Sequence, residues 1–287
     1  THDVMVAGGM ESMTNAPYLL QTGRGGYRLG HDRIFDHMML DGLEDAYEAG
    51  RSMGTFGEDC AAKYNFTRDA QDKFAMASVQ RAQDAIKSGA FKDEIAPVTV
   101  KDRKGERVVD TDEGPGKINI DKIPTLKPAF KKDGTVTAAA SSSINDGAAA
   151  MAMMRESTAK KLGVKPLARI VSHATHAQEP EWFSTAPIGA TEKALAKAGW
   201  QVGDVDLWEV NEACAVVPMA LMHDLKVPHD KVNVNGGACA LGHPIGASGA
   251  RILVTLLYAL KNRGLKKGLA TLCIGGGEAT AMAVELL

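Results

Sequence analysis

Apolar positions at the start of the chain form a short continuous run. His2 to Ala7, in "THDVMVAGGMES", is rich in Val and Met and ends at Gly8-Gly9, a pattern that predicts a buried strand feeding a tight turn. A chain does not normally begin inside its own core, and the opening lacks the charged and apolar segments of a signal peptide. We therefore expect further polypeptide upstream of Thr1.

The middle of the chain, residues 14–136, is mostly irregular and rich in Gly, Asp and Lys. One helix stands out in "TRDAQDKFAMASVQRAQDAIKSG", where Thr67 can act as N-cap and Gly89 can end the helix. Its apolar positions fall near one face: Phe74, Ala82, Ala85 and Ile86. The following "TVTAAASSSINDGAAAMAMM" predicts a strand, a turn at Asn145-Asp146-Gly147 and a second strand.

Regular alternation of elements begins after residue 167. Four apolar runs predict strands: "ARIVSHA", "VDLWEV", "KVNVNGG" and "GLATLCIGGG". Helical periodicity lies between them, near residues 186–198, 213–225 and 244–263. This order predicts an α/β fold whose parallel sheet is covered by helices on both faces.

Two of the predicted strands resemble each other. "VMVAGG" and "TLCIGGG" are apolar, stop at a glycine pair and have an acidic residue close behind, Glu11 or Glu278. If they mark two related halves, the first half lacks the helix that precedes the second strand. A half built from βαβ units of about 30 residues each would need roughly 100 further residues upstream.

Composition narrows the class of protein. The chain has 287 residues, 45% of them hydrophobic, with a net charge of −2, which indicates a globular protein of one large or two ordinary domains. The only basic run, "KDRKGER" at 101–107, is interpreted as a solvated hairpin tip, with an anion site as the alternative, and nucleic-acid binding is not expected. No apolar run approaches the roughly 20 residues of a membrane span. The four cysteines lack zinc-ligand and Cys-x-x-Cys spacing, so we expect no metal site, no disulfides and a reducing compartment.

Two glycine-flanked motifs place polar side chains at strand ends. In "WEVNEACA", Asn211 and Glu212 follow a strand's carboxyl end, where open α/β sheets bind ligands, although the pair could equally cap the next helix. In "NGGACALGHPIGASGAR", His243 lies between Gly242 and Pro244, and Pro244 suits the first turn of a helix. A glycine-rich loop at a helix start offers free N–H groups to a ligand, so we interpret His243 as functional.

A third motif, "TLCIGGGEA", ends a strand on Cys273 and continues with three glycines. Glycines allow backbone N–H groups to crowd an oxyanion without side-chain clash. Together with His243 and Asn211, this predicts acyl chemistry on a thioester or carbonyl. A thiol with an ordinary pKa of about 8.5 can exchange a proton with a moderately acidic carbon when donors stabilise the enolate.

These motifs, with "VAGGMESM" and "SINDGAAA", resemble the thiolases, specifically acetyl-CoA acetyltransferases of the biosynthetic kind, over the whole chain. The resemblance implies a five-layered αβαβα fold of two similar halves with an inserted loop domain, and assembly as a homotetramer. It assigns residues 1–13 and 144–166 to the first half, 14–143 to a CoA-binding loop domain and 167–287 to the second half. It implies reversible Claisen condensation of two acetyl-CoA to acetoacetyl-CoA and CoA, with no cofactor besides the CoA substrate. Gly276 favours the biosynthetic branch.

The resemblance also implies residue roles. His243 would activate the nucleophile and the CoA thiol, Cys273 would deprotonate the second acetyl-CoA, and Asn211 would hold an oxyanion-hole water. The Gly275 N–H would be one donor of a second oxyanion hole. The pantetheine tunnel would be lined by five residues that could also be ordinary core: Ser142, Ala138, Phe130, Met53 and Ala213.

The family's nucleophilic cysteine would lie upstream of this chain, so we expect the chain alone to be inactive. The remaining cysteines are interpreted as packing: Cys60, Cys214 and Cys239. Ser52, and Ala140 with Ser143, depart from the short-chain pattern and leave acyl length open. Two alternatives therefore remain, a thiolase for longer 3-ketoacyl-CoAs and a non-catalytic chain that binds acyl-CoA or assembles with a partner. A bacterial cytoplasm is the expected compartment, with an organelle matrix as the alternative.

Overall fold

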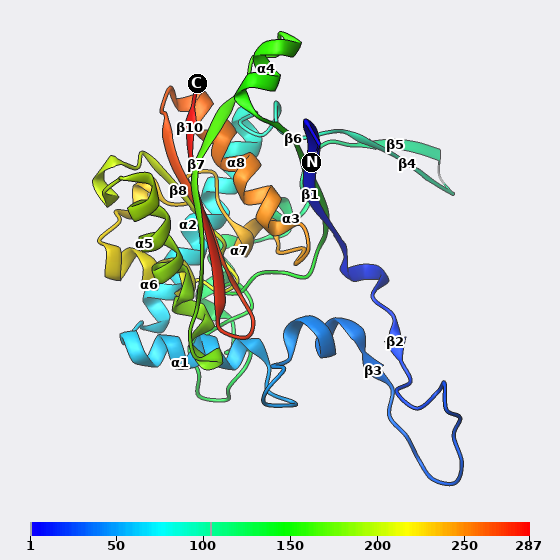
Figure 1. The fold of residues 1–287 in the computed structure, drawn as a ribbon. Helices are drawn as coiled ribbons and strands as arrows, with labels where there is room; N and C mark the ends of the chain where they lie inside the picture. Colours follow the sequence, from blue (N-terminus) through cyan, green and yellow to red (C-terminus); the bar gives the residue numbers. More distant parts are fainter. Residues whose placement is uncertain (1, 104) are drawn as a thin grey trace.

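The computed structural model describes residues 2–103 and 105–287 and is built around a four-stranded sheet (Figure 1). The strand order is β7-β10-β9-β8, and the strands are β7 (Ala168–Ala177), β8 (Leu207–Val210), β9 (Lys267–Ile274) and β10 (Glu278–Leu286). Only β8 and β9 are parallel, while β10 is antiparallel to both its neighbours. The predicted parallel sheet is therefore wrong for most pairings, because β10, which the pattern did not reveal, returns from β9 through a glycine turn. The strand predicted at "KVNVNGG" is reduced to one bridge, between Val232 and Trp208.

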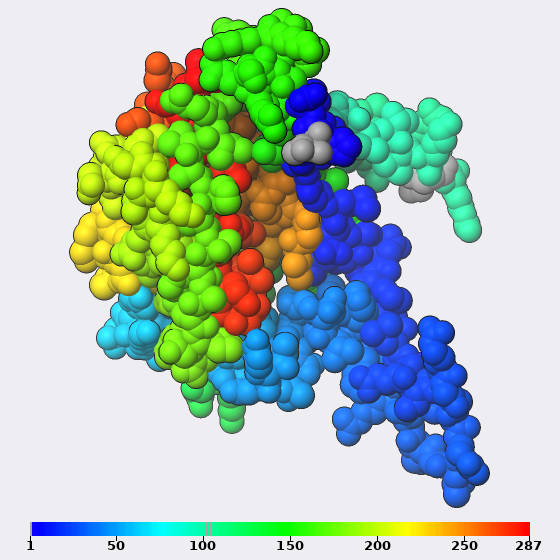
Figure 2. Space-filling view, viewed as in Figure 1, coloured from blue at the N-terminus to red at the C-terminus, as the bar shows by residue number. Residues whose placement is uncertain are grey.

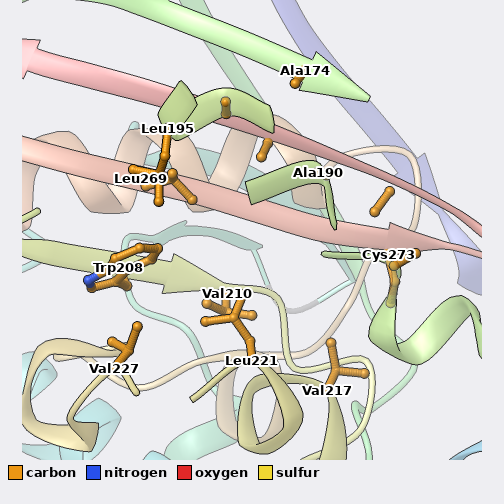
Figure 3. Packing of buried hydrophobic residues seen from close by; sticks show 14 of the residues in the cluster. Ala174, Ala190, Leu195, Trp208, Val210, Val217, Leu221, Val227, Leu269 and Cys273 are labelled. Carbon is orange, nitrogen blue, oxygen red and sulfur yellow. The ribbon is translucent and has the colours of Figure 1, made fainter. Parts of the chain in front are cut away.

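Helices cover both faces of this sheet. Alternate residues of β9 point to opposite sides: Leu269 and Cys273 join the core beneath α5 (Ala186–Ala198) and α6 (Val216–Leu225), whereas Ala270 packs with α8 (Ser248–Arg263). Figure 3 shows the first cluster, with Cys273 beside Val217 and with Trp208 at the opposite side of the view. The three helices predicted here are confirmed. α6 starts three residues later than predicted and α8 four residues later, and the residues directly before α8 form the loop that carries His243.

A second, two-stranded ribbon lies beside the sheet. It consists of β1 (Val4–Ser12) and β6 (Asp146–Met154), paired antiparallel from Val4–Met154 to Ser12–Asp146. The prediction of a buried opening strand is wrong in two respects. β1 continues straight through Gly8 and Gly9, and Val6 and Met10 are each 78% exposed. The turn predicted at Asn145–Gly147 is also wrong, because Asp146 and Gly147 already belong to β6, and the strand predicted before it does not form.

Between β1 and β6 the chain makes a long excursion. It contains α1 (Met53–Tyr64), which the pattern missed, and α2 (Arg68–Ser88), which is confirmed: the Thr67 hydroxyl accepts from the Ala70 N–H at 3.2 Å, and Gly89 adopts φ +75°. Two arms project from the body, one holding β2 (Tyr18–Leu19) and β3 (Phe35–Asp36), the other the hairpin β4 (Val98–Asp102) and β5 (Gly105–Val109) (Figures 1 and 2). The hairpin is the one predicted for the basic run, of which residue 104 lies outside the described residues.

Three short α-helices are α3 (Gly114–Lys117), α4 (Glu156–Leu162) and α7 (Ala238–Leu241). The described fold also contains a π-helix, η2 (Met39–Leu43), and five short 3-10 helices: η1 (Met13–Asn15), η3 (Ile120–Thr125), η4 (Pro180–Thr185), η5 (Val202–Asp204) and η6 (His229–Lys231). Within the described residues, every helix is too short or too polar to span a lipid bilayer.

Candidate active site

Asn211 is placed by the junction of β8 and β9. Its backbone N–H donates to the Thr271 carbonyl of β9 at 3.0 Å, so it continues the parallel ladder one residue beyond β8. The side chain is 1% exposed; its Nδ2 lies 3.3 Å from Nε2 of His243, and its Oδ1 is buried without a protein partner among the described residues. The alternative helix-capping role is wrong, because α6 begins only at Val216 and has no side-chain cap. Asn211 therefore presents a buried, unused acceptor beside an imidazole.

His243 is held at both ends of its loop. Gly242, at φ +88°, ends α7, and the His243 backbone N–H then donates to the Ser143 carbonyl at 3.1 Å. The ring Nδ1 lies 2.5 Å from Oγ of Ser248, the first residue of α8. Pro244 stands in the connecting loop, not in the first turn of a helix as predicted, and its carbonyl accepts the Ser248 hydroxyl at 3.0 Å.

This network fixes the protonation of the imidazole. The Ser248 hydroxyl donates its hydrogen bond to the Pro244 carbonyl, so the hydroxyl oxygen accepts a hydrogen bond from the His243 Nδ1–H. The lone pair then resides on Nε2 and faces the Asn211 amide. Burial, and after it the positive charge of Arg251, lowers the pKa of His243 to about 4. The ring is consequently neutral at pH 7 and can accept a proton at Nε2.

Cys273 lies at the carboxyl end of β9, two residues beyond the Val210–Thr271 pair that precedes Asn211. It is 7% exposed, and burial raises the pKa of its thiol to about 12. The thiol therefore keeps its proton at neutral pH, and its thiolate, once formed, is a strong base. Adjacent parallel strands thus bring the candidate base and the candidate oxyanion residue to the same edge of the sheet.

The glycine turn after Cys273 depends on its residue type. Gly276 and Gly277 adopt φ +102° and +100°, and a Cβ on Gly277 would lie 2.2 Å from the Gln178 carbonyl oxygen. The Gly277 carbonyl accepts from the Gln178 N–H at 3.0 Å, which fixes the turn from behind. Gly275 is exposed at the opening of this turn.

The five predicted tunnel residues fall into three places. The Met53 sulfur lies 3.3 Å from the position of a Cβ on Gly275, and the Phe130 ring packs over Gly54 beside it. Ser142 donates to the Ala213 carbonyl from both its N–H and its hydroxyl, at 3.1 Å each. Ala138 is exposed in the turn between Thr137 and Ala140.

Two contributions to the site were not predicted from the sequence, which did not single out Ser248 and singled out Ser143 only as a departure from the short-chain pattern. Ser248 sets the tautomer of His243, and Ser143 holds its backbone. A serine at the first position of a long helix, five residues after a histidine, is the signal that could have identified Ser248. Ser143 contributes only its carbonyl, which no residue-type pattern reveals.

None of the other cysteines is activated. Burial raises the pKa of Cys60 and of Cys214 to about 11, and that of Cys239 well above its ordinary value. All four cysteines are free thiols. Among the described residues, no group of three His, Cys, Asp or Glu side chains is arranged to hold a metal ion.

Comparison with known proteins agrees with this geometry. Residues 1–157 match the model of the thiolase N-terminal domain, and residues 164–286 match the model of the thiolase C-terminal domain. The chain therefore belongs to the thiolase family.

Similar proteins and solved structures cover the chain almost completely. An acetyl-CoA acetyltransferase of Chromobacterium violaceum is 53% identical over 99% of this chain and 72% of its own length, and a probable acetyl-CoA acetyltransferase of Dictyostelium discoideum is 51% identical over 99% and 68%. The crystal structure of the Bacillus anthracis acetyl-CoA acetyltransferase superimposes with a TM-score of 0.95 at 44% identity, covering 99% of this chain and 72% of that one. Human mitochondrial 3-ketoacyl-CoA thiolase gives a TM-score of 0.94 at 40% identity, with the same coverage. The predicted thiolase fold is confirmed.

Proposed function

We propose that this chain carries the acid–base half of a biosynthetic-type thiolase, which condenses two acetyl-CoA reversibly to acetoacetyl-CoA and CoA. The observation that carries the proposal is the Asn211–His243 pair, a neutral imidazole whose Nε2 lone pair lies beside a buried, unpartnered amide oxygen. Relatives named acetyl-CoA acetyltransferase, about half identical over the whole chain, support the substrate.

In this mechanism His243 and Cys273 carry out separate proton transfers. His243 Nε2 accepts the proton of the attacking thiol, and a water held by Asn211 stabilises the oxygen of the second thioester. Cys273 gives its proton to the CoA thiolate that leaves the first acetyl-CoA, and the Cys273 thiolate so formed removes the α-proton of the second acetyl-CoA. The resulting carbanion attacks the acyl group carried by the nucleophilic cysteine, and that cysteine leaves as a thiolate that recovers its proton from His243. In the thiolytic direction the protonated Cys273 returns this proton to carbon, which suits a thiol whose pKa is about 12. The Gly275 N–H is proposed as a donor to the acyl oxygen, and the coenzyme A thioester is the substrate without a further cofactor.

The nucleophile is proposed to come from outside the described residues. Each cysteine here has a raised pKa, whereas a nucleophilic cysteine needs a lowered one. A cavity of about 910 Å³ between the β1–β6 ribbon and α8 offers apolar surface to such a segment, from Met151 and Met153 on one side to Leu253 and Leu257 on the other.

The remaining assignments belong to the same proposal. Residues 1–13 with 144–166, 14–143 and 167–287 are proposed as first half, loop domain and second half. The exposed arm around β2 and β3, with Tyr18 71% and Ile34 67% exposed, supports assembly as a homotetramer. Met53, Phe130, Ser142, Ala138 and Ala213 are proposed to line the pantetheine path. Four free thiols support a cytoplasmic location.

The test combines thiolysis of acetoacetyl-CoA with an intact-mass spectrum of the same sample. We expect activity only when a companion polypeptide of roughly 100 residues is present. Activity without a companion would overturn the external nucleophile. A parallel measurement, deuterium uptake into the methyl group of acetyl-CoA in D₂O, needs only the residues of this chain, and its absence would contradict the acid–base assignment.

A second candidate is a thiolase for longer 3-ketoacyl-CoAs, which the likeness to the human mitochondrial 3-ketoacyl-CoA thiolase favours. Rates of thiolysis for four-carbon and six-carbon ketoacyl-CoAs would separate the two. A chain that only binds acyl-CoA would show neither thiolysis with a companion nor deuterium uptake.

A further inference from the structure

Glu212, the residue after Asn211, is a fully buried carboxylate that meets only hydrogen-bond donors. Its exposed fraction is 0%. Oε1 accepts from Asn233 Nδ2 at 2.8 Å, and Oε2 accepts from the Ser78 hydroxyl at 2.7 Å and from the Cys239 N–H at 2.9 Å. These three donors are uncharged. A carboxylate is costly to bury, and here it is stabilised by donors from three separate segments.

The three donors connect the parts of the candidate site. Cys239 belongs to α7, which leads directly into Gly242 and His243. Ser78 belongs to α2 of the long excursion, and its oxygen also accepts from the Gly237 N–H at 3.0 Å. Glu212 itself continues the backbone of Asn211. One carboxylate therefore fixes the segment of Asn211, the segment of His243 and the helix packed against both.

The pocket around the carboxylate is built from glycine. A Cβ on Gly237 would lie 2.3 Å from the Glu212 carboxyl carbon, and a Cβ on Gly236, which adopts φ +80°, would lie 2.5 Å from the Ser78 carbonyl oxygen. The two glycines of "NGGA", which the sequence pattern places in a candidate ligand-binding loop, therefore have a structural role: Gly237 leaves room for the Glu212 carboxylate, and Gly236 leaves room for α2 at Ser78.

Glutamine cannot replace the carboxylate in either orientation. Asn233 cannot turn over, because its Oδ1 accepts the Val210 N–H and its Nδ2 donates to the Val210 carbonyl, both at 2.8 Å. A glutamine amide nitrogen would therefore face the Asn233 amide nitrogen on one side, or the Cys239 N–H on the other. Each orientation leaves donor against donor in a site without water access.

We infer that Glu212 is a positioning residue for the thiolase reaction: its charge holds Asn211 and the His243 loop at the separation that the reaction requires. The expected effect on the reaction rate rests on the proposed function. The positioning of Asn211 and the His243 loop rests on the hydrogen bonds alone. Misplacement of about 1 Å at a reacting centre costs on the order of 100-fold in rate.

The experiment compares Glu212→Gln with Ser78→Ala and with Asp206→Asn as matched control. Asp206 accepts the Lys266 and Lys267 N–H groups through one oxygen at the opposite end of β8, so its variant makes the same carboxylate-to-amide change away from His243. In the assembled enzyme we expect Glu212→Gln to lower kcat for thiolysis about 10- to 100-fold with KM changed less than about threefold, Ser78→Ala to lower kcat less, and Asp206→Asn to leave both unchanged.

A second readout does not require activity. NMR titration of the histidine ring in the 287-residue chain, assigned with His243→Gln, follows the pKa of His243. We expect this pKa to rise from its depressed value in Glu212→Gln and, by a smaller amount, in Ser78→Ala, because a loosened loop exposes the ring. If Glu212→Gln is too unstable to purify, Ser78→Ala decides alone.

The outcomes distinguish the positioning role of Glu212 from the proposed function. An unchanged His243 pKa with unchanged kcat would overturn the inference, and so would equal effects of Asp206→Asn. A shifted His243 pKa in a protein without thiolysis or deuterium uptake would support the positioning role and contradict the proposed function.

Discussion

Two of the antiparallel strand pairs, β1–β6 and β9–β10, contain strands with the same local sequence pattern and have opposite environments. β1 reads "VMVAGG" and β9 ends in "TLCIGGG", yet Val6 of β1 is 78% exposed, whereas Leu269 of β9 is 0% exposed. Helices pack against β9 on both faces, α5 on one and α8 on the other, while the main helix packed against β1 is α8. Apolar strand pattern therefore predicts pairing, and the elements packed around the strand decide burial.

The largest expected effect tests whether the condensation step depends on Cys273 at the end of β9. Cys273→Ser should slow condensation by about 100-fold or more while acyl transfer to the nucleophile in the assembled enzyme stays largely intact, because a serine hydroxyl is a poor proton acceptor from carbon. Rapid-quench measurement of both steps checks this. Cys60→Ser is the control, a buried free cysteine in a different apolar cluster from Cys273. Equal loss of both steps would reject the assignment of Cys273.

The burial contrast itself can be measured as stability. In the 287-residue chain, Leu269→Ala should lower the free energy of unfolding by about 2–5 kcal/mol, because it leaves a cavity in the core. Val6→Ala should change it by less than about 0.5 kcal/mol. Urea unfolding followed by circular dichroism gives both values. A cost for Val6→Ala comparable to that of Leu269→Ala would show that the ribbon is covered in solution.

His243 lies between the segment that enters β6 and the end of β8, and it gives a pH-dependent stability. The pKa of its ring falls from about 6.5 in the unfolded chain to about 4 in the folded one. The unfolded chain therefore binds more protons between these values, so the contribution to stability is present above pH 6.5 and is lost as pH falls through 4. It amounts to about 3 kcal/mol.

The measurement is the unfolding free energy of wild type minus that of His243→Gln from pH 4 to 8. We expect this difference to rise up to pH 6.5 and to stay flat above it. The subtraction removes Glu209, whose raised pKa of about 8 gives the opposite slope. A flat difference throughout would contradict the buried, neutral ring.

The smallest effect concerns a crowded point between β1 and the loop that follows His243. A Cβ on Gly9 would lie 2.0 Å from the Gly246 carbonyl oxygen in the loop that follows His243. Gly9→Ala should therefore cost about 1–3 kcal/mol and shift the ring resonances of His243. Gly203→Ala, where a Cβ meets nothing within 4 Å, should do neither. A neutral Gly9→Ala would mean that the ribbon and the loop separate readily.

The candidate site followed from the sequence because residue types and short-range spacing define it. Asn211 follows a strand, His243 follows a glycine, and Cys273 precedes three glycines; each of these signals lies within a few residues. The helix α2 was likewise predictable, since Thr67 and Gly89 mark its ends and its apolar face is regular.

The rest depends on contacts between distant segments. The antiparallel return of β10 follows from turns at Gly276 and Gly277, which sequence alone interprets equally as an oxyanion loop. Glu212 reads as a helix cap, and only the fold brings Ser78 and Asn233 to its carboxylate. Short apolar stretches such as "KVNVNGG" fail as strands because their polar side chains have partners elsewhere.

The pairing of Ser12 with Asp146 has one more consequence. The chain leaves the ribbon at Ser12 and re-enters it directly opposite, and the Asp146 carboxylate accepts the Thr14 N–H at 2.8 Å, closing the base of the excursion. The ladder is therefore indifferent to the length of what lies between these two points. Insertion or deletion in the projecting arms of the segment would leave β1 and β6 in register. Ser78 and Ser143 also belong to the segment and bind Glu212 and His243, so the arms can change in length while the parts that carry these two residues cannot.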